Sequence, residues 1–196
     1  MKRHCHGLWL AQATGIDISD VQIGLAIQKA TAAGIATHFI AADVYVLPQN
    51  VQQGTFDDVY TGGGALAWLP DIRRWAQVVA AALRLGGRLI LWEIHPLATC
   101  LWVKDKQLQL VGNYFGRSTP SYDHGWSHFG GGEHASEAKV EFCWPIGDVV
   151  TAIVQAGLSI ELLTEFPADG RDRYRFGDVL DEVGQLPSHF LLIARK

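Results

Sequence analysis

The stretch that decides the fold covers residues 56–96 and reads FDDVYTGGGALAWLPDIRRWAQVVAAALRLGGRLILWEIHP. Phe56 to Thr61 is a short run of the kind that forms strands. Asp71 to Leu85 carries apolar residues at helical spacing, which predicts an amphipathic helix ended by the pair Gly86-Gly87. The apolar run Arg88 to Trp92 predicts a further strand. A strand, a helix and a strand in this order are typical of a sheet with parallel neighbours.

The chain before this stretch repeats the same order. Ala13 to Ile18 predicts a strand, Ser19 can cap a helix that Gly34 ends after about four turns, and Thr37 to Ala42 predicts a second strand. The resulting β-α-β-β-α-β order predicts a mostly parallel sheet with helices on both faces. Ligands of such sheets bind beyond the carboxyl ends of the strands, which here hold Asp17, Asp43, Thr61 and Glu93.

The second half of the chain is less regular. Residues 97–144 are rich in Gly, His, Ser and aromatic residues and too long for a connector, so we expect a lid or substrate cap. A helix is predicted from about Ile146 to Ala156, followed by strands at Leu158 to Phe166 and His189 to Ala194. No helical pattern separates these two strands, so we expect an antiparallel pair. We predict one domain, residues 1–196, with an insert at about 97–144.

Composition limits the classes of function. With 48% hydrophobic residues the chain can form a core, and its net charge of -4 supplies no broad positive surface for nucleic acid. Cys5, Cys100 and Cys143 are too scattered for a disulfide framework or a zinc finger, which favours a reducing compartment. No apolar run is long enough for a membrane span and no signal-peptide core follows residue 1. We expect a cytoplasmic protein with neither nucleic-acid nor membrane partners; the oligomeric state is not predicted.

Several segments, in this order and spacing, resemble the class I S-adenosylmethionine-dependent methyltransferases, in particular bacterial methyltransferase-domain proteins with small-molecule acceptors. The resemblance implies a three-layer, Rossmann-like α/β fold whose mostly parallel sheet ends in an antiparallel strand pair. It also implies methyl transfer from S-adenosylmethionine to a small molecule. The segments are TGIDIS (Thr14 to Ser19), AADV (Ala41 to Val44), FDDVYTGGGALAWLPDIRRWA (Phe56 to Ala76), LRLGGRLILWEIHP (Leu83 to Pro96), IVQAGLSIELLTEFP (Ile153 to Pro167) and FLLIARK (Phe190 to Lys196).

The resemblance assigns cofactor roles to residues at the strand ends. Asp17 would accept hydrogen bonds from both ribose hydroxyls, which suits a carboxylate because it is an acceptor only. Asp43 would face the adenine amino group, Ile18 and Val44 would enclose the ring, and Thr61 would lie beside the methionine part.

Two candidate cofactor contacts, Asp17 and the run that follows Thr61, have a structural alternative. Asp17 could cap the following helix, although Ser19 is better placed to do so. The run Gly62-Gly63-Gly64 could approach the cofactor with its backbone, or form a turn that needs unusual dihedral angles.

The front of the chain departs from the family pattern. Members begin with a strand and a glycine-rich loop before the ribose-binding acid, whereas only sixteen residues precede Asp17. His4 to Gln12, HCHGLWLAQ, resembles a shortened variant of that loop, and Gly7, its one glycine, is the candidate cofactor contact. The first strand of the family is therefore expected to be short or missing.

Methyl transfer from a sulfonium needs mainly alignment and desolvation, so no fixed triad is expected. A general base helps when the acceptor carries a proton, and His95 at a strand end is the candidate. His95 could equally order the turn after its strand. The insert histidines His124, His128 and His134 match no metal-site spacing, and no metal is expected. Aromatic residues such as Trp126 and Phe129 could line the acceptor pocket or pack the insert.

Two other functions remain open. A nicotinamide-dependent Rossmann oxidoreductase also binds ribose with an acid after its second strand, but the chain lacks GxGxxG. An antiparallel closing pair would count against this alternative. A truncated, non-catalytic remnant would keep the sheet without the cofactor, and tight cofactor binding would exclude it.

Overall fold

The computed structural model describes residues 11–124, 138–172 and 176–196. The chain divides into two compact units, Met1–Gln49 and Asn50–Lys196. The single domain expected over residues 1–196 stays a prediction. The expected short or missing first strand falls on residues 1–10, outside the described part.

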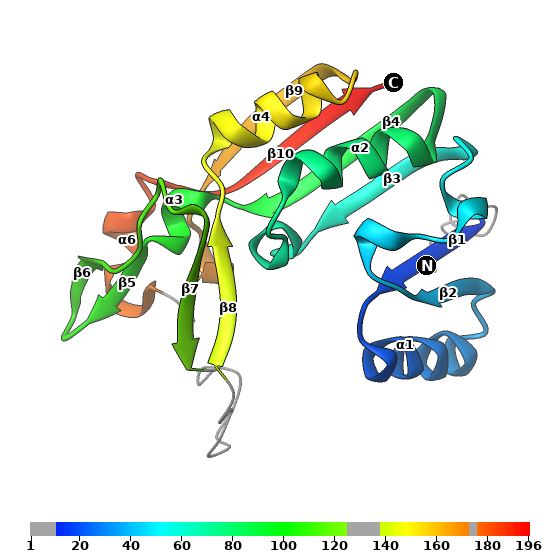
Figure 1. Cartoon of the computed structure of the whole chain (residues 1–196). Coiled ribbons are helices and arrows are strands. Elements are labelled where there is room, and N and C mark those ends of the chain that lie inside the picture. Colours follow the sequence, from blue (N-terminus) through cyan, green and yellow to red (C-terminus); the bar gives the residue numbers. More distant parts are fainter. Residues whose placement is uncertain (1–10, 125–137, 173–175) are drawn as a thin grey trace, which may run out of the picture. The chain divides into compact units, whose positions relative to one another are not determined.

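The first unit contains the predicted strand, helix and strand. β1 (Ala13–Asp17) and β2 (Thr37–Ala41) pair in parallel, and α1 (Asp20–Ala33) connects them (Figure 1). The Ser19 hydroxyl accepts a hydrogen bond from Gln22 N, which caps α1 as predicted. Gly34 ends α1 in the left-handed region at φ 66°, where glycine carries no steric penalty. The 3-10 turns η2 (Val44–Val46) and η3 (Gln49–Val51) follow.

The second unit is built on a four-stranded sheet in the order β3-β4-β10-β9. β3 (Phe56–Gly62) and β4 (Leu83–Ile94) are parallel. β10 (Pro187–Arg195) lies antiparallel between β4 and β9 (Ser159–Pro167). The predicted antiparallel closing pair is confirmed, and the sheet of this unit is mixed.

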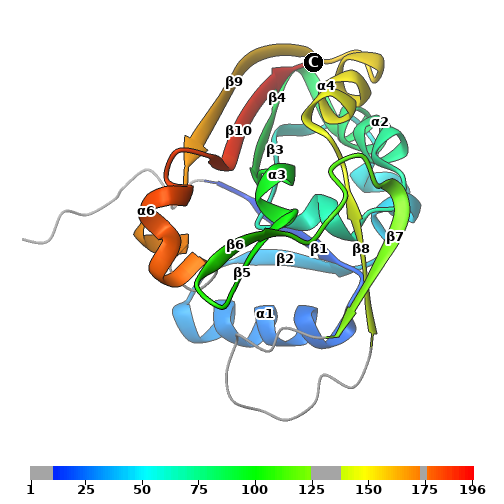
Figure 2. The ribbon, with the colours of Figure 1, turned by 90° about the vertical axis from the view of Figure 1, so that its left-hand side faces the viewer.

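Helices α2 (Ile72–Ala82) and α4 (Ile146–Gln155) lie side by side on one face of this sheet (Figures 1 and 2). Asp71 caps α2 by accepting a hydrogen bond from Arg74 N, and the apolar side of the helix is buried. The hydrophobic spacing read from the sequence therefore identified the buried side of α2 correctly. Its fully buried side chains include Trp75, Leu83, Leu89, Leu91, Val149, Ile153, Phe190 and Leu192.

One predicted boundary is wrong. The helix expected from Asp71 to Leu85 ends at Ala82, and the strand expected from Arg88 begins at Leu83. Leu83 is fully buried and pairs with Phe56, so tertiary packing overrides its helical propensity. The pair Gly86-Gly87 does not stop a helix but lies within β4, where the register between β3 and β4 shifts between the pairs Phe56–Leu83 and Asp58–Arg88.

The insert contains more regular structure than expected. It starts with the short helix α3 (Pro96–Thr99) and the hairpin of β5 (Leu101–Lys104) and β6 (Gln107–Leu110). β7 (Arg117–His124) and β8 (Ala138–Cys143) form a second antiparallel pair (Figure 2). Its role as a lid or substrate cap stays a prediction, and His128, His134, Trp126 and Phe129 lie outside the described residues.

The connection between the last two strands also differs from the prediction, because it contains helical turns. These are η6 (Gly170–Asp172), η7 (Gly177–Val179) and α6 (Leu180–Val183). Residues of η7 and α6 pack with α3 and β5 around a second small core that includes Phe176 and Val183. The buried Asp172 carboxylate accepts hydrogen bonds from Ser188 Oγ and Asp169 N, which ties the connection to β10.

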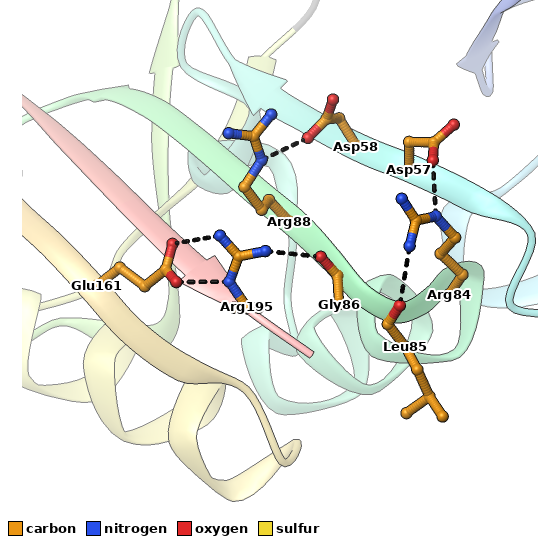
Figure 3. Close-up of polar contacts among 8 residues, drawn as sticks. All are labelled: Asp57, Asp58, Arg84, Leu85, Gly86, Arg88, Glu161 and Arg195. Carbon is orange, nitrogen blue, oxygen red and sulfur yellow. Dashed lines mark hydrogen bonds and ion pairs between the residues drawn. The ribbon is translucent and has the colours of Figure 1, made fainter.

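Arginine–carboxylate pairs cross the sheet near the amino ends of β3 and β4 (Figure 3). The Arg195 guanidinium binds both Glu161 carboxylate oxygens and the Gly86 carbonyl, which holds the end of β10 to both neighbours. These partly exposed pairs lie at the end of the sheet away from the carboxyl ends of β3 and β4. The pairs are Arg84 with Asp57 (2.6 Å), Arg88 with Asp58 (2.9 Å) and Arg195 with Glu161 (2.5 Å).

Candidate functional site

In the first unit, two predicted cofactor residues lie at the carboxyl ends of neighbouring parallel strands. Asp17 pairs with Ala41, and the Asp17 carbonyl accepts a hydrogen bond from Ala42 N (2.9 Å). This pairing brings Asp43 next to the end of β1. The structure therefore places Asp17 and Asp43 at one edge of this strand pair, as the sequence predicted.

The contacts of the two carboxylates are local. Asp17 Oδ1 accepts a hydrogen bond from Ser19 N (2.8 Å), and Asp43 Oδ1 accepts one from Tyr45 N (2.9 Å). Asp43 thus caps the turn η2, whereas the cap of α1 is Ser19. Asp17 is exposed, and the neighbouring Ile18 side chain is 74% exposed, which is unusual for isoleucine. Val44 is half-buried.

In the second unit, the carboxyl ends of β3 and β4 are joined by a buried acid. Glu93, 3% exposed, accepts hydrogen bonds from Gly64 N (2.8 Å) and Leu66 N (3.3 Å). Burial raises the pKa of Glu93 above 4.5, and hydrogen bonds from backbone N–H groups offset part of the shift. Glu93 thus fixes the loop that follows the half-buried Thr61.

The backbone of the run Gly62-Gly63-Gly64 after Thr61 requires glycine for structural reasons. Gly63 and Gly64 adopt φ 75° and 91°, in the left-handed region. A Cβ on Gly62 would collide with the Trp92 carbonyl oxygen of the neighbouring strand. These dihedral angles and this close approach support the turn that the sequence left as an alternative to backbone contact with the cofactor.

A small pocket opens beside Glu93. The residues that line it are mainly apolar, and those with polar side-chain atoms include Glu93, Thr99 and Cys143. Sequence reasoning noted Glu93 only as a strand-end residue and missed its place in this pocket, although an acid at a strand end was the available signal. The lining residues are Gly64, Leu66, Ala67, Glu93, Ile94, Pro96, Thr99, Phe142, Cys143, Trp144, Val149 and Phe190.

His95, the predicted general base, is held at both ring nitrogens. Nδ1 accepts a hydrogen bond from Leu97 N (3.0 Å), and Nε2 therefore carries the proton that it shares with Glu165 Oε1 (2.8 Å). The ring caps α3 and is buried. Burial lowers the pKa of His95 below 6.5, and the hydrogen bond and charge of Glu165 offset part of the shift. The contacts favour the alternative that His95 orders the turn, and its role as a base stays a prediction.

These contacts predict a pH-dependent contribution of His95 to stability. Because its pKa is lower in the folded state, His95 stabilises the fold above pH 6.5, and this contribution is lost as the pH falls through the folded pKa. Protonation would also place an N–H on Nδ1 opposite the Leu97 N–H. In His95→Asn the amide oxygen can still cap α3, but it does not titrate.

We therefore expect the free energy of unfolding of the wild type to fall more steeply below pH 6.5 than that of His95→Asn. Urea unfolding at several pH values between about 5 and 8 measures the difference. Parallel pH profiles for the two chains would show that His95 makes no such contribution.

The remaining predicted site residue, Gly7, lies outside the described part of the chain. In the parts that the structure describes, no helix has both the length and the apolar character needed to cross a membrane.

Comparisons with known proteins identify the fold. The family model described as "Methyltransferase domain" matches residues 3–87. A search of curated proteins found no match. An S-adenosylmethionine-dependent methyltransferase from Mesorhizobium loti aligns over 94% of this chain and 80% of its own, with 21% identity and a TM-score of 0.66.

Two further structures agree with this match. A putative S-adenosylmethionine-dependent methyltransferase from Listeria monocytogenes aligns over 94% of this chain and 79% of its own, with 15% identity and a TM-score of 0.66. Geranyl diphosphate C-methyltransferase from Streptomyces coelicolor A3(2) aligns over 94% and 62%, with 10% identity and a TM-score of 0.61. The predicted resemblance is confirmed: this chain has the Rossmann-like α/β fold of the S-adenosylmethionine-dependent methyltransferases, and residues 3–87 match their methyltransferase domain.

Proposed function

We propose that this chain is an S-adenosylmethionine-dependent methyltransferase that acts on a small-molecule acceptor in the cytoplasm. The observation that carries the proposal is the edge of the β1–β2 pair, where Asp17 ends β1 and Asp43 follows the neighbouring parallel strand β2. The methyltransferase structures with the same fold support it, as does the solved geranyl diphosphate methyltransferase for the acceptor class. The antiparallel β9–β10 pair counts against the nicotinamide-dependent alternative.

The residues of this edge fit the chemistry of a nucleoside. Ser19 N is the hydrogen-bond donor to the Asp17 carboxylate among the described residues, and it contacts Oδ1, so Oδ2 can accept from a ribose diol. Ile18, exposed beside it, offers an apolar surface on which an adenine ring can stack. Asp43 and Val44 would contact the same ring. An adenine ring that covers the exposed Ile18 side chain would remove apolar surface from water, which stabilises the complex.

The resemblance to the methyltransferases is the ground on which Thr61 and Gly7 are proposed as contacts of the methionine end of the cofactor. Bound S-adenosylmethionine supplies a methyl group that is already electrophilic because it sits on a sulfonium. The protein then has to align the acceptor and exclude water. The largely apolar pocket beside Glu93 supports an apolar or weakly polar acceptor of small size. We propose no nucleic-acid partner, because a net charge of -4 supplies no broad positive surface for phosphate groups.

Asp17→Ala should weaken S-adenosylmethionine binding by about 10 to 100-fold, because a charge-assisted contact worth about 1.5 to 3 kcal/mol is lost. Asp17→Asn removes the negative charge but keeps the local contact, because its amide oxygen can still accept a hydrogen bond from Ser19 N. Asp20→Ala, an exposed acid three residues away in the first turn of α1, is the matched control and should bind as the wild type does. Unchanged affinity in a folded Asp17→Ala variant would remove Asp17 from the site.

The experiment that tests the function is calorimetric titration of the purified chain with S-adenosylmethionine and its demethylated product, with NADH as the control ligand. Micromolar binding of either methionine compound supports the proposal and justifies a screen of apolar small-molecule acceptors. Binding of NADH alone would favour the oxidoreductase. A folded chain that binds none of the three would be a non-catalytic remnant.

A further inference from the structure

Two cysteine side chains that are far apart in the sequence meet beside the pocket. Cys100 Sγ and Cys143 Sγ are 3.9 Å apart, and both are thiols in this structure. Cys100 donates to the Pro96 carbonyl at 3.3 Å, and Cys143 approaches the same oxygen at 3.8 Å. Both thiols thus lie near the Pro96 carbonyl at the start of α3, and Cys143 Sγ also approaches the Tyr114 carbonyl at 3.6 Å.

The position of this pair in the fold is specific. Cys100 follows α3 where the chain leaves the four-stranded sheet, and Cys143 ends β8 just before the chain returns to the sheet through α4. The pair thus stands at the two ends of the insert and spans both of its strand pairs. Cys143 also lines the pocket beside Glu93.

The two thiols differ in access. Cys100 is 1% exposed, whereas Cys143 is partly exposed. An oxidant that enters from solvent or from the pocket therefore reaches Cys143 first, and Cys100 is the nearby thiol that can resolve the product.

We propose that Cys100 and Cys143 are an oxidative modification site that forms a reversible disulfide with hydroperoxide oxidants. In the first step the Cys143 sulfur attacks the peroxide oxygen, the O–O bond breaks, and a sulfenic acid and water form with hydrogen peroxide. In the second step the Cys100 sulfur attacks the Cys143 sulfur, the S–S bond forms, and the sulfenic oxygen leaves as water. Overall, two thiols lose two electrons and two protons, and the peroxide is reduced to water.

The movement that the bond requires is small. The sulfurs must close from 3.9 Å to about 2.05 Å. The disulfide would join the two ends of the insert covalently. It would also replace the free thiol of Cys143, a residue that lines the pocket, with a disulfide sulfur. The proposal does not depend on cofactor binding.

Treatment of the folded full chain with a few equivalents of hydrogen peroxide tests the site. The sequence has three cysteines, so we expect the count of reactive thiols to fall to that of Cys5 alone. The intact mass should fall by about 2 Da, and dithiothreitol should restore it. Digestion without reduction should yield one peptide pair joined through Cys100 and Cys143. The oxidised chain should melt roughly 5 to 10 °C higher than the reduced one, because the cross-link constrains the unfolded chain.

Two variants make the result decisive. Cys5→Ser should behave as the wild type, because Cys5 takes no part in the proposed bond. Cys143→Ser, a nearly isosteric change at a partly exposed position, should lose the mass shift and the rise in melting temperature. A disulfide that includes Cys5, or a folded wild-type chain that gains oxygen without forming the Cys100–Cys143 bond, would overturn the proposal.

Discussion

Replacing Trp75 with alanine should lower the free energy of unfolding of the Asn50–Lys196 unit by about 3 to 5 kcal/mol. Trp75 is 1% exposed and is the largest fully buried side chain among the described residues, on the side of α2 that faces the sheet. Its removal loses the transfer free energy of the indole and leaves a cavity that packed neighbours refill only partly. This loss is a large part of the about 5 to 15 kcal/mol by which domains are usually stable.

Chemical denaturation followed by circular dichroism measures this change, and Gln77→Ala is the matched control. Gln77 lies in the same helix on its exposed side, so its replacement should alter the free energy of unfolding by less than about 0.5 kcal/mol. Equal effects of the two substitutions would show that α2 does not pack against the sheet as described.

Replacing Glu93 with alanine should lower the free energy of unfolding by about 2 to 4 kcal/mol. The carboxylate accepts hydrogen bonds from Gly64 N and Leu66 N, and Leu66 is itself buried. Without the carboxylate these N–H groups lose their acceptor in a place that water reaches poorly. Because the same loop follows Thr61, we expect acceptor turnover to suffer in addition to stability.

Glu93→Gln separates the negative charge of this side chain from its ability to accept hydrogen bonds. The amide oxygen can keep one of the two backbone hydrogen bonds, and the buried charge is removed, so the loss should stay below about 1.5 kcal/mol. Denaturation of both variants against the wild type gives the comparison. If alanine were tolerated as well as glutamine, the loop would not depend on Glu93.

The sequence predicted most elements because their signals are local. The cap at Ser19 and the left-handed end at Gly34 mark α1, and both act as expected in the structure. The helical spacing that contains Trp75 and Val79 predicted the buried side of α2. Patterns of this kind depend only on residues within a few positions of one another.

Other features depend on contacts between distant residues and could not be predicted. The helical spacing of apolar residues extends through Leu83, but the pairing of Leu83 with Phe56 makes it the first residue of β4. The β5–β6 hairpin turns at Asp105 and Lys106, both with positive φ, and this dipeptide is not among the usual hairpin signals. The contact of Glu93 with Gly64 and the meeting of Cys100 with Cys143 likewise join segments that no local pattern links.

The place of β10 in its sheet has a consequence for biosynthesis. This strand is made after β4 and β9, yet it lies between them and supplies all the backbone hydrogen bonds that join them. Until Pro187–Arg195 has left the ribosome, the nascent chain holds two strands whose facing edges have no partner. Exposed strand edges of this kind invite pairing with other chains. We expect the four-stranded sheet to be completed only after synthesis of β10, so the interval before that moment is when this protein most needs protection by chaperones.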